Sequence, residues 1–240
     1  NNVIDMTGGA GKLILKGGLT GTVGTLSSST TSQVRFESTT AAQTIPVFLT
    51  GGYNDIYINN TSAGGATLAG ALTATNLKGN ITIGDANTGS KFNTGNFAVT
   101  LNNTKGITLA ENSQLNTGTS VITFGTGGTA AINGYLKTSN AAGLSGSTTT
   151  VFNSTNTPTV TLGANSTVEY SSTGAQSVTA RADYAALILS GSGAKTMAGT
   201  ATTATINKDL TASGGGFADG GKAITVKGNI VNSVAFTGAG

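Results

Sequence analysis

The segment Asn80–Phe124 reads NITIGDANTGSKFNTGNFAVTLNNTKGITLAENSQLNTGTSVITF. It contains short runs of β-branched and other apolar residues in which apolar and polar side chains alternate, the pattern of a strand with one buried face. Gly, Asn and Thr between the runs are turn residues. Ile81, Leu101 and Val121 stand 20 residues apart (101 − 81 = 121 − 101). This beat predicts short strands that recur at the period of a coil.

Runs of the same kind occur along the whole chain, and no window shows the apolar spacing of three and four that marks a helix. They cover residues 12–16, 33–37, 55–58, 80–83, 97–101, 120–124, 159–162, 167–170, 187–189 and 223–226. We therefore predict an all-β fold, a right-handed parallel β-helix or β-solenoid with a thin core of stacked Val, Ile and Leu. Tandem β-sandwich domains are the alternative, because irregular strands and Gly-rich turns suit them equally.

A longer repeat underlies the short beat. Val34–Ile45 matches Val168–Val178, and the match continues from 53–58 onto 184–189. Further matches pair 67–70 with 196–199, 77–81 with 206–210, Phe92 with Phe217, and 98–101 with 223–226. The offset drifts from 134 (168 − 34) to 125 (223 − 98). We predict two repeat copies, 1–110 and 111–240, that form one continuous solenoid and belong to a longer chain.

Composition argues against most enzyme chemistry. The 240 residues include no Cys and no His, so there is no Ser-His-Asp triad, Cys nucleophile or usual zinc, iron–sulfur or haem site. The carboxylates are scattered, so they form no paired acid and base for glycan cleavage. We expect a protein that is not an enzyme, with no catalytic residues, cofactor or metal site.

Charge and hydropathy narrow the partners. The chain has 12 basic and 9 acidic residues, a net charge of +3, and its lysines form no run. A nucleic-acid-binding protein would cluster them, so we expect no nucleic-acid partner. No apolar stretch approaches the length of a membrane-spanning helix, which predicts no transmembrane segment.

Two Gly-rich motifs are interpreted as turns. Gly51-Gly-Tyr-Asn-Asp55-Ile56 is similar to a calcium-binding β-roll repeat, but it occurs once, and such sites need consecutive copies; calcium binding stays open. Gly8-Gly-Ala-Gly11-Lys12 lacks the Ser or Thr and the helix of a phosphate-binding loop. Thr-x-Thr pairs, such as Thr159 and Thr161, suggest ice binding as a minor alternative and exposed strand positions as the simpler one.

The segments Thr167–Val178 and Tyr184–Thr196 resemble a repeat found in very large secreted or surface proteins of Bacteroidota. Asn2–Gly17 and Gly134–Gly143 are similar to other segments of the same arrays. The resemblance covers nearly the whole chain and implies an adhesin-like or filament-forming protein, of the kind that the type IX system often exports. It supplies no catalytic residues.

These observations predict a structural module of a bacterial cell-surface or secreted fibre, located outside the cell, whose main partner is itself. The alternative is an adhesin module that binds glycans or other cells through exposed Tyr, Asn and Thr. Tyr57 and Tyr135 are the candidate contact residues for that role. Tyr53 and Tyr184 recur at matched repeat positions, which favours packing for them. Functional amyloid is a third option, but its repeats are usually short.

Overall fold

The described chain consists of short parallel strands joined by turns. The computed structural model describes residues 3–19, 24–85 and 89–238, and none of these residues is helical. Every pair of named strands is parallel. β-Sandwiches of the immunoglobulin type are antiparallel, so the sandwich alternative is wrong. The predicted β-solenoid is confirmed.

The first face is a seven-stranded sheet that a shorter pair of strands extends. Beyond its last strand, Leu162 N donates to Asp183 Oδ2, and Tyr184 bridges to Ile206 in the added pair. In chain order the strands are β2 (Lys12–Leu15), β4 (Gln33–Phe36), β7 (Asp55–Ile58), β9 (Ile81–Ile83), β12 (Gly106–Leu109), β15 (Thr129–Ile132) and β17 (Thr159–Leu162), followed by β22 (Thr203–Ile206) and β25 (Ala223–Val226).

The second face is a nine-stranded sheet that crosses residue 110 without a break, because β13 pairs with strands on both sides of it. Its strands are β5 (Gln43–Ile45), β8 (Ala66–Leu68), β10 (Lys91–Asn93), β13 (Gln114–Gly118), β16 (Tyr135–Thr138), β18 (Thr167–Tyr170), β20 (Ala186–Leu189), β23 (Leu210–Ala212) and β26 (Ile230–Asn232).

The third face is the least regular, since isolated bridges such as Leu72 to Val99 and Ile122 to Phe152 connect its shorter sheets. Its strands are β1 (Val3–Met6), β3 (Thr25–Ser28), β6 (Thr50–Gly51), β11 (Val99–Thr100), β14 (Ile122–Thr123), β19 (Gln176–Thr179), β21 (Lys195–Ala198), β24 (Phe217–Ala218) and β27 (Phe236–Thr237).

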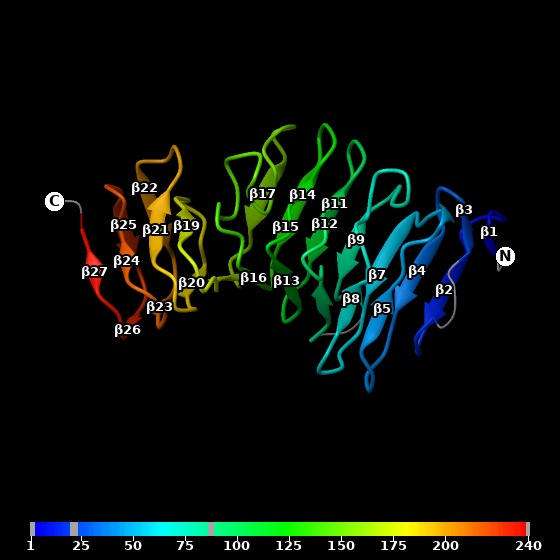
Figure 1. Ribbon diagram of the computed structural model, residues 1–240, viewed down its shortest axis with the longest axis horizontal. Coiled ribbons are helices and arrows are strands. Elements are labelled where there is room, and N and C mark those ends of the chain that lie inside the picture. The colour runs from blue at the N-terminus through cyan, green and yellow to red at the C-terminus, as the bar shows by residue number, and fades with distance from the viewer. Residues whose placement is uncertain (1–2, 20–23, 86–88, 239–240) are drawn as a thin grey trace.

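The chain visits the three faces in a constant order and completes about ten turns. Figure 1 shows these turns stacked along the long axis, with the two termini at opposite ends. One turn takes 20 residues between Thr203 and Ala223 but 30 between Thr129 and Thr159. The predicted beat of 20 is therefore only the shortest turn. Ile81 lies on the first face, whereas Leu101 and Val121 flank third-face strands.

Inward side chains form continuous apolar columns. On the first face Val34, Ile56, Ile81, Ile107 and Ala130 stack in register, and none is more than 3% exposed. The outward row one residue later contains Tyr57, Thr82 and Thr108, in line with the predicted alternation. The core is a narrow axial column, so each turn is stabilised mainly by the two turns that touch it.

Buried Asn side chains satisfy backbone groups at the corners between faces. Asn102 Nδ2 donates to the carbonyl oxygens of Ala74 and Leu77, both at 2.9 Å. Asn140 Nδ2 donates to three carbonyls in the same way. Irregular corners leave carbonyls that no strand partner reaches, and an unpaired buried carbonyl is costly. The Asn residues therefore hold the turns together where the sheets are interrupted.

Candidate functional site

The last turn leaves core-type side chains uncovered. Ile230 continues the buried column of Leu187 and Leu210 but is 58% exposed, and Phe236 stacks on the buried Phe217 and is 44% exposed. The two rings lie edge to face with centroids 5.0 Å apart. A cavity of about 290 Å³ opens here, lined by Leu210, Asp219, Lys222, Ile224, Val226, Ile230, Phe236, Thr237 and Gly238. This set is called the C-terminal end surface below.

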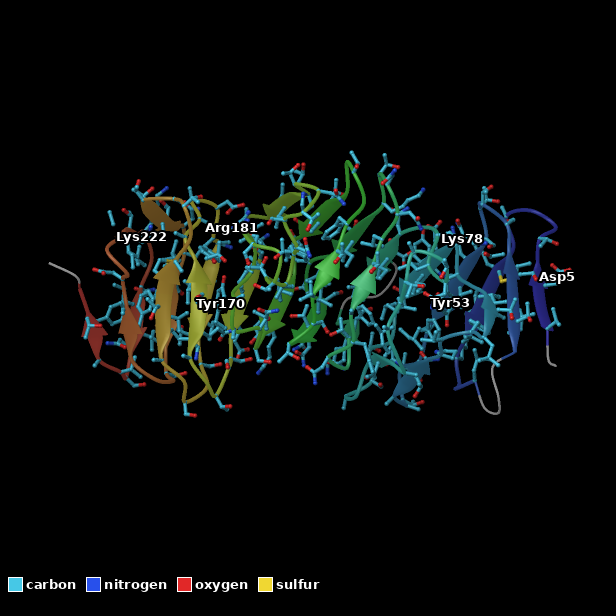
Figure 2. All side chains as sticks on the ribbon, turned by 45° about the horizontal axis from the view of Figure 1, so that its top comes forward. Asp5, Tyr53, Lys78, Tyr170, Arg181 and Lys222 are labelled. Atoms are coloured by element: carbon cyan, nitrogen blue, oxygen red, sulfur yellow. The ribbon has the colours of Figure 1, made fainter. Side chains whose placement is uncertain are left out.

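The first turn ends in the same manner. Leu13 and Leu15 lie in register with the buried Val34 and Phe36, and Ile4 with Leu26, yet these three are only partly buried. A cavity of about 410 Å³ is lined by Ile4, Asp5, Met6, Gly8, Gly9, Gly11, Lys12 and Leu13. This set is called the N-terminal end surface. Figure 2 shows Asp5 and Lys222 near opposite ends of the rod.

Each end surface presents both parts of a solenoid contact. The terminal strands β2 and β26 each pair with one strand only, so their outer edges offer unpaired backbone donors and acceptors. Exposed parallel edges of this kind are templates for further pairing. Beside each edge lies the apolar row that another turn would cover. An additional β-turn of the same shape is therefore what each end fits.

The two predicted contact tyrosines are half-buried and engaged within the chain. The Cζ atom of Arg35 lies 4.6 Å from the ring centroid of Tyr57, a cation–π contact. The hydroxyl of Tyr135 donates to Glu169 Oε2. The two residues lie on different faces, on β7 and β16, so they form no common platform. Their role in glycan contact stays a prediction.

Tyr53, Tyr170 and Tyr184 are fully buried, as expected for packing residues. Tyr53 donates to Pro46 O at 2.7 Å, and Tyr184 donates to Thr179 O at 2.8 Å. The Tyr170 and Tyr184 hydroxyl oxygens are 2.7 Å apart. Desolvation is the largest cause that raises the pKa of all three phenols above their ordinary value.

This burial predicts a loss of stability in alkali. Above pH about 10 the unfolded chain releases phenolic protons that the folded chain keeps, so the free energy of unfolding falls as pH rises, by up to about 1.4 kcal/mol per pH unit for each such tyrosine. Chemical unfolding between pH about 8 and about 11 measures the slope. Tyr53→Phe should reduce it, since that ring no longer ionises. An equal slope in both proteins would contradict this account.

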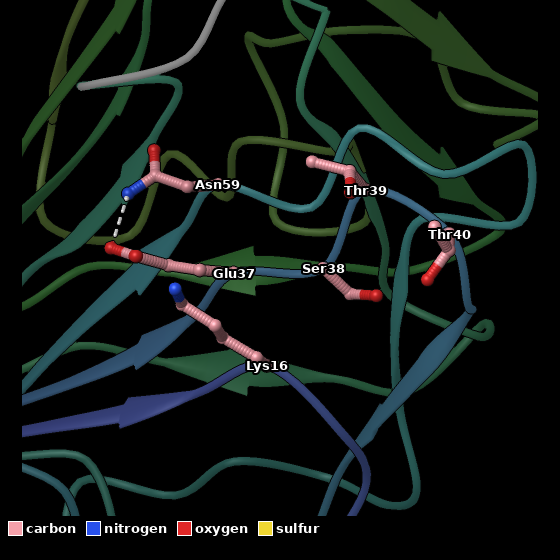
Figure 3. A pocket seen from close by; sticks show the side chains of 6 residues that line it. All are labelled: Lys16, Glu37, Ser38, Thr39, Thr40 and Asn59. Atoms are coloured by element: carbon pink, nitrogen blue, oxygen red, sulfur yellow. Dashed lines mark hydrogen bonds between the residues drawn. The ribbon is translucent and has the colours of Figure 1, made fainter.

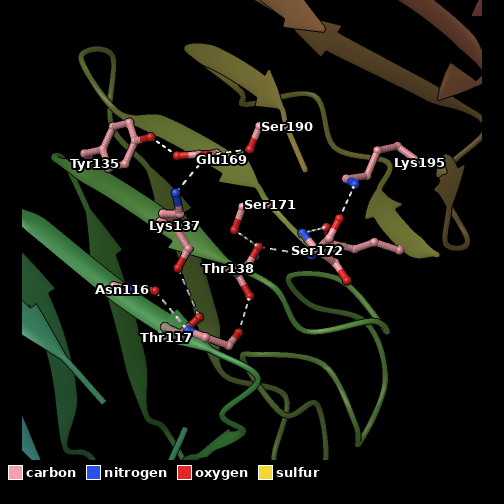
Figure 4. A network of polar contacts seen from close by, with 12 residues as sticks. Asn116, Thr117, Tyr135, Lys137, Thr138, Glu169, Ser171, Ser172, Ser190 and Lys195 are labelled. Atoms are coloured by element: carbon pink, nitrogen blue, oxygen red, sulfur yellow. Dashed lines mark hydrogen bonds and ion pairs between the residues drawn. The ribbon is translucent and has the colours of Figure 1, made fainter. Parts of the chain in front are cut away.

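A polar cluster ties three successive turns of the second face (Figure 4). Glu169 on β18 is 6% exposed and accepts from Lys137 Nζ at 3.1 Å, from the Tyr135 hydroxyl and from Ser190 Oγ. A buried carboxylate needs such partners because its desolvation is costly. The cluster is saturated by its own members, which indicates a structural role.

Lys195 is buried without a carboxylate partner among its printed contacts. Its Nζ donates to Ser172 O at 2.9 Å and to Gly193 O at 2.7 Å, and burial lowers the pKa of this amine. Lys195 was missed by sequence reasoning, although one signal existed: the matched position of the other repeat copy is the apolar Ala66, which is also buried. The two carbonyls compensate for the absent counter-ion.

A polar groove of about 400 Å³ lies at the corner between the first and second faces (Figure 3). Glu37 Oε1 accepts from Arg35 Nε at 2.7 Å and from Asn59 Nδ2 at 3.4 Å. Hydroxyl, amide and ammonium groups at one corner suit hydrogen bonding to a polar ligand. The lining residues are Lys16, Glu37, Ser38, Thr39, Thr40 and Asn59.

No group of three or more acidic, His or Cys side chains able to hold a metal ion occurs among the described residues. Within the same residues, no helix is long and apolar enough to cross a membrane. The end surfaces were also missed by sequence reasoning, because Ile230 and Phe236 sit in runs that resemble every other strand. Comparison of the chain with family models, curated proteins and solved structures finds no match.

Proposed function

We propose that this chain is a structural, non-enzymatic repeat module of a bacterial cell-surface or secreted fibre, acting as a stiff scaffold that associates with itself. The observation that carries the proposal is the pair of open end surfaces, each with a free parallel edge and an uncovered apolar row. A turn from a second copy would extend the sheets and bury those rows. The resemblance to bacterial surface arrays supports the extracellular location.

The side surface supports the same role. Only 9% of the residues are charged, and the outward rows are largely Thr, Ser and Asn. The buried charged residues Arg35, Glu169 and Lys195 are paired within the chain. A rod with so little net charge has weak self-repulsion, which favours the packing of rods side by side.

Self-association is testable with two neighbouring residues of β26. Ile230 and Val231 are 58% and 60% exposed, but Ile230 continues an inward column, whereas Val231 lies in the outward row beyond Thr211. We expect Ile230→Lys to weaken end-to-end association by about tenfold or more, because burying an Ile contributes about 1.5–3 kcal/mol and an unpaired buried ammonium costs more. Sedimentation velocity over a concentration series measures this.

Val231→Lys is the matched control and should associate as the unsubstituted chain does, since its side chain points away from the contact. Electron microscopy of the same samples should show rods of one solenoid width that lengthen with concentration. The proposal is wrong if the unsubstituted chain stays monomeric throughout the series, or if the two variants associate equally well. The adhesin alternative stays a prediction, because no observation favours it over the scaffold.

A further inference from the structure

The two copies of the long repeat make the same local contacts. Gln43 and Gln176 occupy matched positions, and each side-chain amide donates to two carbonyl oxygens, two residues apart, in the preceding turn. The acceptors are Leu15 and Gly17 in one copy and Thr138 and Asn140 in the other. Distances range from 2.7 to 3.1 Å. The match in sequence is therefore also a match in three-dimensional contacts.

A second pair of contacts agrees. Tyr53 and Tyr184 are matched, and each hydroxyl donates to the carbonyl oxygen three residues after the matched Gln, on Pro46 and Thr179 respectively. Phe36 and Tyr170 are matched, buried, and lie beside these tyrosines: the Phe36 ring centroid is 6.4 Å from that of Tyr53, and the Tyr170 hydroxyl contacts that of Tyr184. Each unit thus folds locally in one way.

The matched strands nevertheless lie on different faces. β4 is on the first face, whereas its match β18 is on the second; β5 is on the second, and its match β19 is on the third. The same displacement holds for all further matches, which pair β7 with β20, β8 with β21, β9 with β23, β10 with β24 and β11 with β25. Every match is shifted by one face in the same direction.

Counting strands gives the size of the shift. From β4 the first face continues through β7, β9, β12 and β15 to β17, which is five complete turns. The match of β4 is the next strand, β18, one face further. We infer that the repeat unit spans five and one third turns, so that successive units turn by one face and present the same surface in a new direction.

The spacing of strands sets the dimensions of this screw. Parallel strands stack about 4.8 Å apart, so a unit rises by about 26 Å while it turns by one face. Three units complete 16 turns (3 × 5⅓) and restore the first orientation. The shift is compatible with folding because each face offers the next turn the same parallel ladder, so a segment's contacts depend on the preceding turn and not on which face it occupies.

This geometry has a consequence for the fibre, and that consequence rests on the proposed function. The corner after Phe36 contains Thr39 and the corner after Tyr170 contains Thr173, and both threonines are exposed. In a scaffold built from such units, a second rod that recognises this corner finds it on each side in turn. Lateral contacts are then distributed around the rod, which favours bundles over flat sheets.

The shift is measured within one chain by two doubly spin-labelled variants. Thr39→Cys/Ala164→Cys labels two exposed residues at the corner between the first and second faces, five turns apart. Thr39→Cys/Thr173→Cys labels the matched repeat positions. We expect the first distance to be about 24 Å, five strand spacings, and the second to be longer by several ångströms, because Thr173 also lies one face away.

If the units were in phase with the turns, Thr173 would lie directly above Thr39, and the order of the two distances would reverse. Equal or reversed distances would therefore overturn the inference. Circular dichroism confirms that both variants keep the fold, since all three positions are exposed. The labelled chain is diluted with unlabelled chain, so that only distances within one molecule are read. The result is thus independent of whether the chain assembles, and a failure of the proposed function would leave it unchanged.

Discussion

Leu109→Asp is expected to unfold the central turns of the rod. Leu109 is fully buried in β12 and stacks between Ile83 and Ile132 in an inward column. A carboxylate there would have no partner, and an unpaired buried charge together with a lost Leu side chain costs about 4 kcal/mol or more. Because each turn is supported by its two neighbours, the damage would spread along the axis.

The neighbouring Thr108 provides the matched control. It lies on the same strand, but its side chain points outward and is exposed. Thr108→Asp should cost about 1 kcal/mol or less, the range of β-propensity. Urea unfolding followed by circular dichroism compares the two free energies of unfolding. A similar loss in both variants would show that the inward column does not carry the stability of the fold.

Gly193→Ala is the second large expected effect. A Cβ atom at this position would lie 1.8 Å from the carbonyl oxygen and 2.2 Å from the carbonyl carbon of Gly174, which belongs to the preceding turn. Neither atom can move without displacing the backbone of that turn. Overpacking of this kind costs about 1–3 kcal/mol. Lys195 would add to the loss, since its Nζ donates to Gly193 O and Ser172 O beside the clash.

Gly174 is the control for this substitution, because the two glycines lie at the same corner one turn apart. A Cβ atom on Gly174 would meet only Ser172 Oγ, at 3.8 Å, which is ordinary van der Waals contact. Gly174→Ala should therefore change the free energy of unfolding by less than about 0.5 kcal/mol. Thermal unfolding of the two variants in parallel decides the matter, and equal midpoints would contradict the close approach of the turns.

Local pattern was sufficient for the positions of most strands. The runs at 12–16, 33–37, 55–58 and 167–170 all contain strands, since alternation directly reports one buried face. The run 97–101 was longer than the strand it holds: only Val99–Thr100 pairs, and Phe97 is 39% exposed in the turn before it. Alternation cannot show where backbone pairing ends, because the corner geometry sets that limit.

The candidate site was less accessible to sequence reasoning. The repeat correctly marked Tyr53 and Tyr184 as packing residues, since a matched apolar position is one that both copies bury. It did not show that Tyr57 and Tyr135 lie on different faces, or that Arg35 and Glu169 occupy them with contacts inside the chain. Those contacts join residues up to 34 positions apart, and turn length decides which residues meet.

From its residue order alone, the chain determined that it forms short strands with one apolar side, separated by Gly and Asn turns and repeated in two long copies. These features depend on neighbours in the sequence. Only the tertiary structure decided which strand stacks on which, that matched segments are displaced by one face, and that Ile230 lies at an open end while Leu210 beneath it is covered. The reason is that turns of 20 to 30 residues accumulate along the axis, so each face assignment depends on the lengths of all the turns before it.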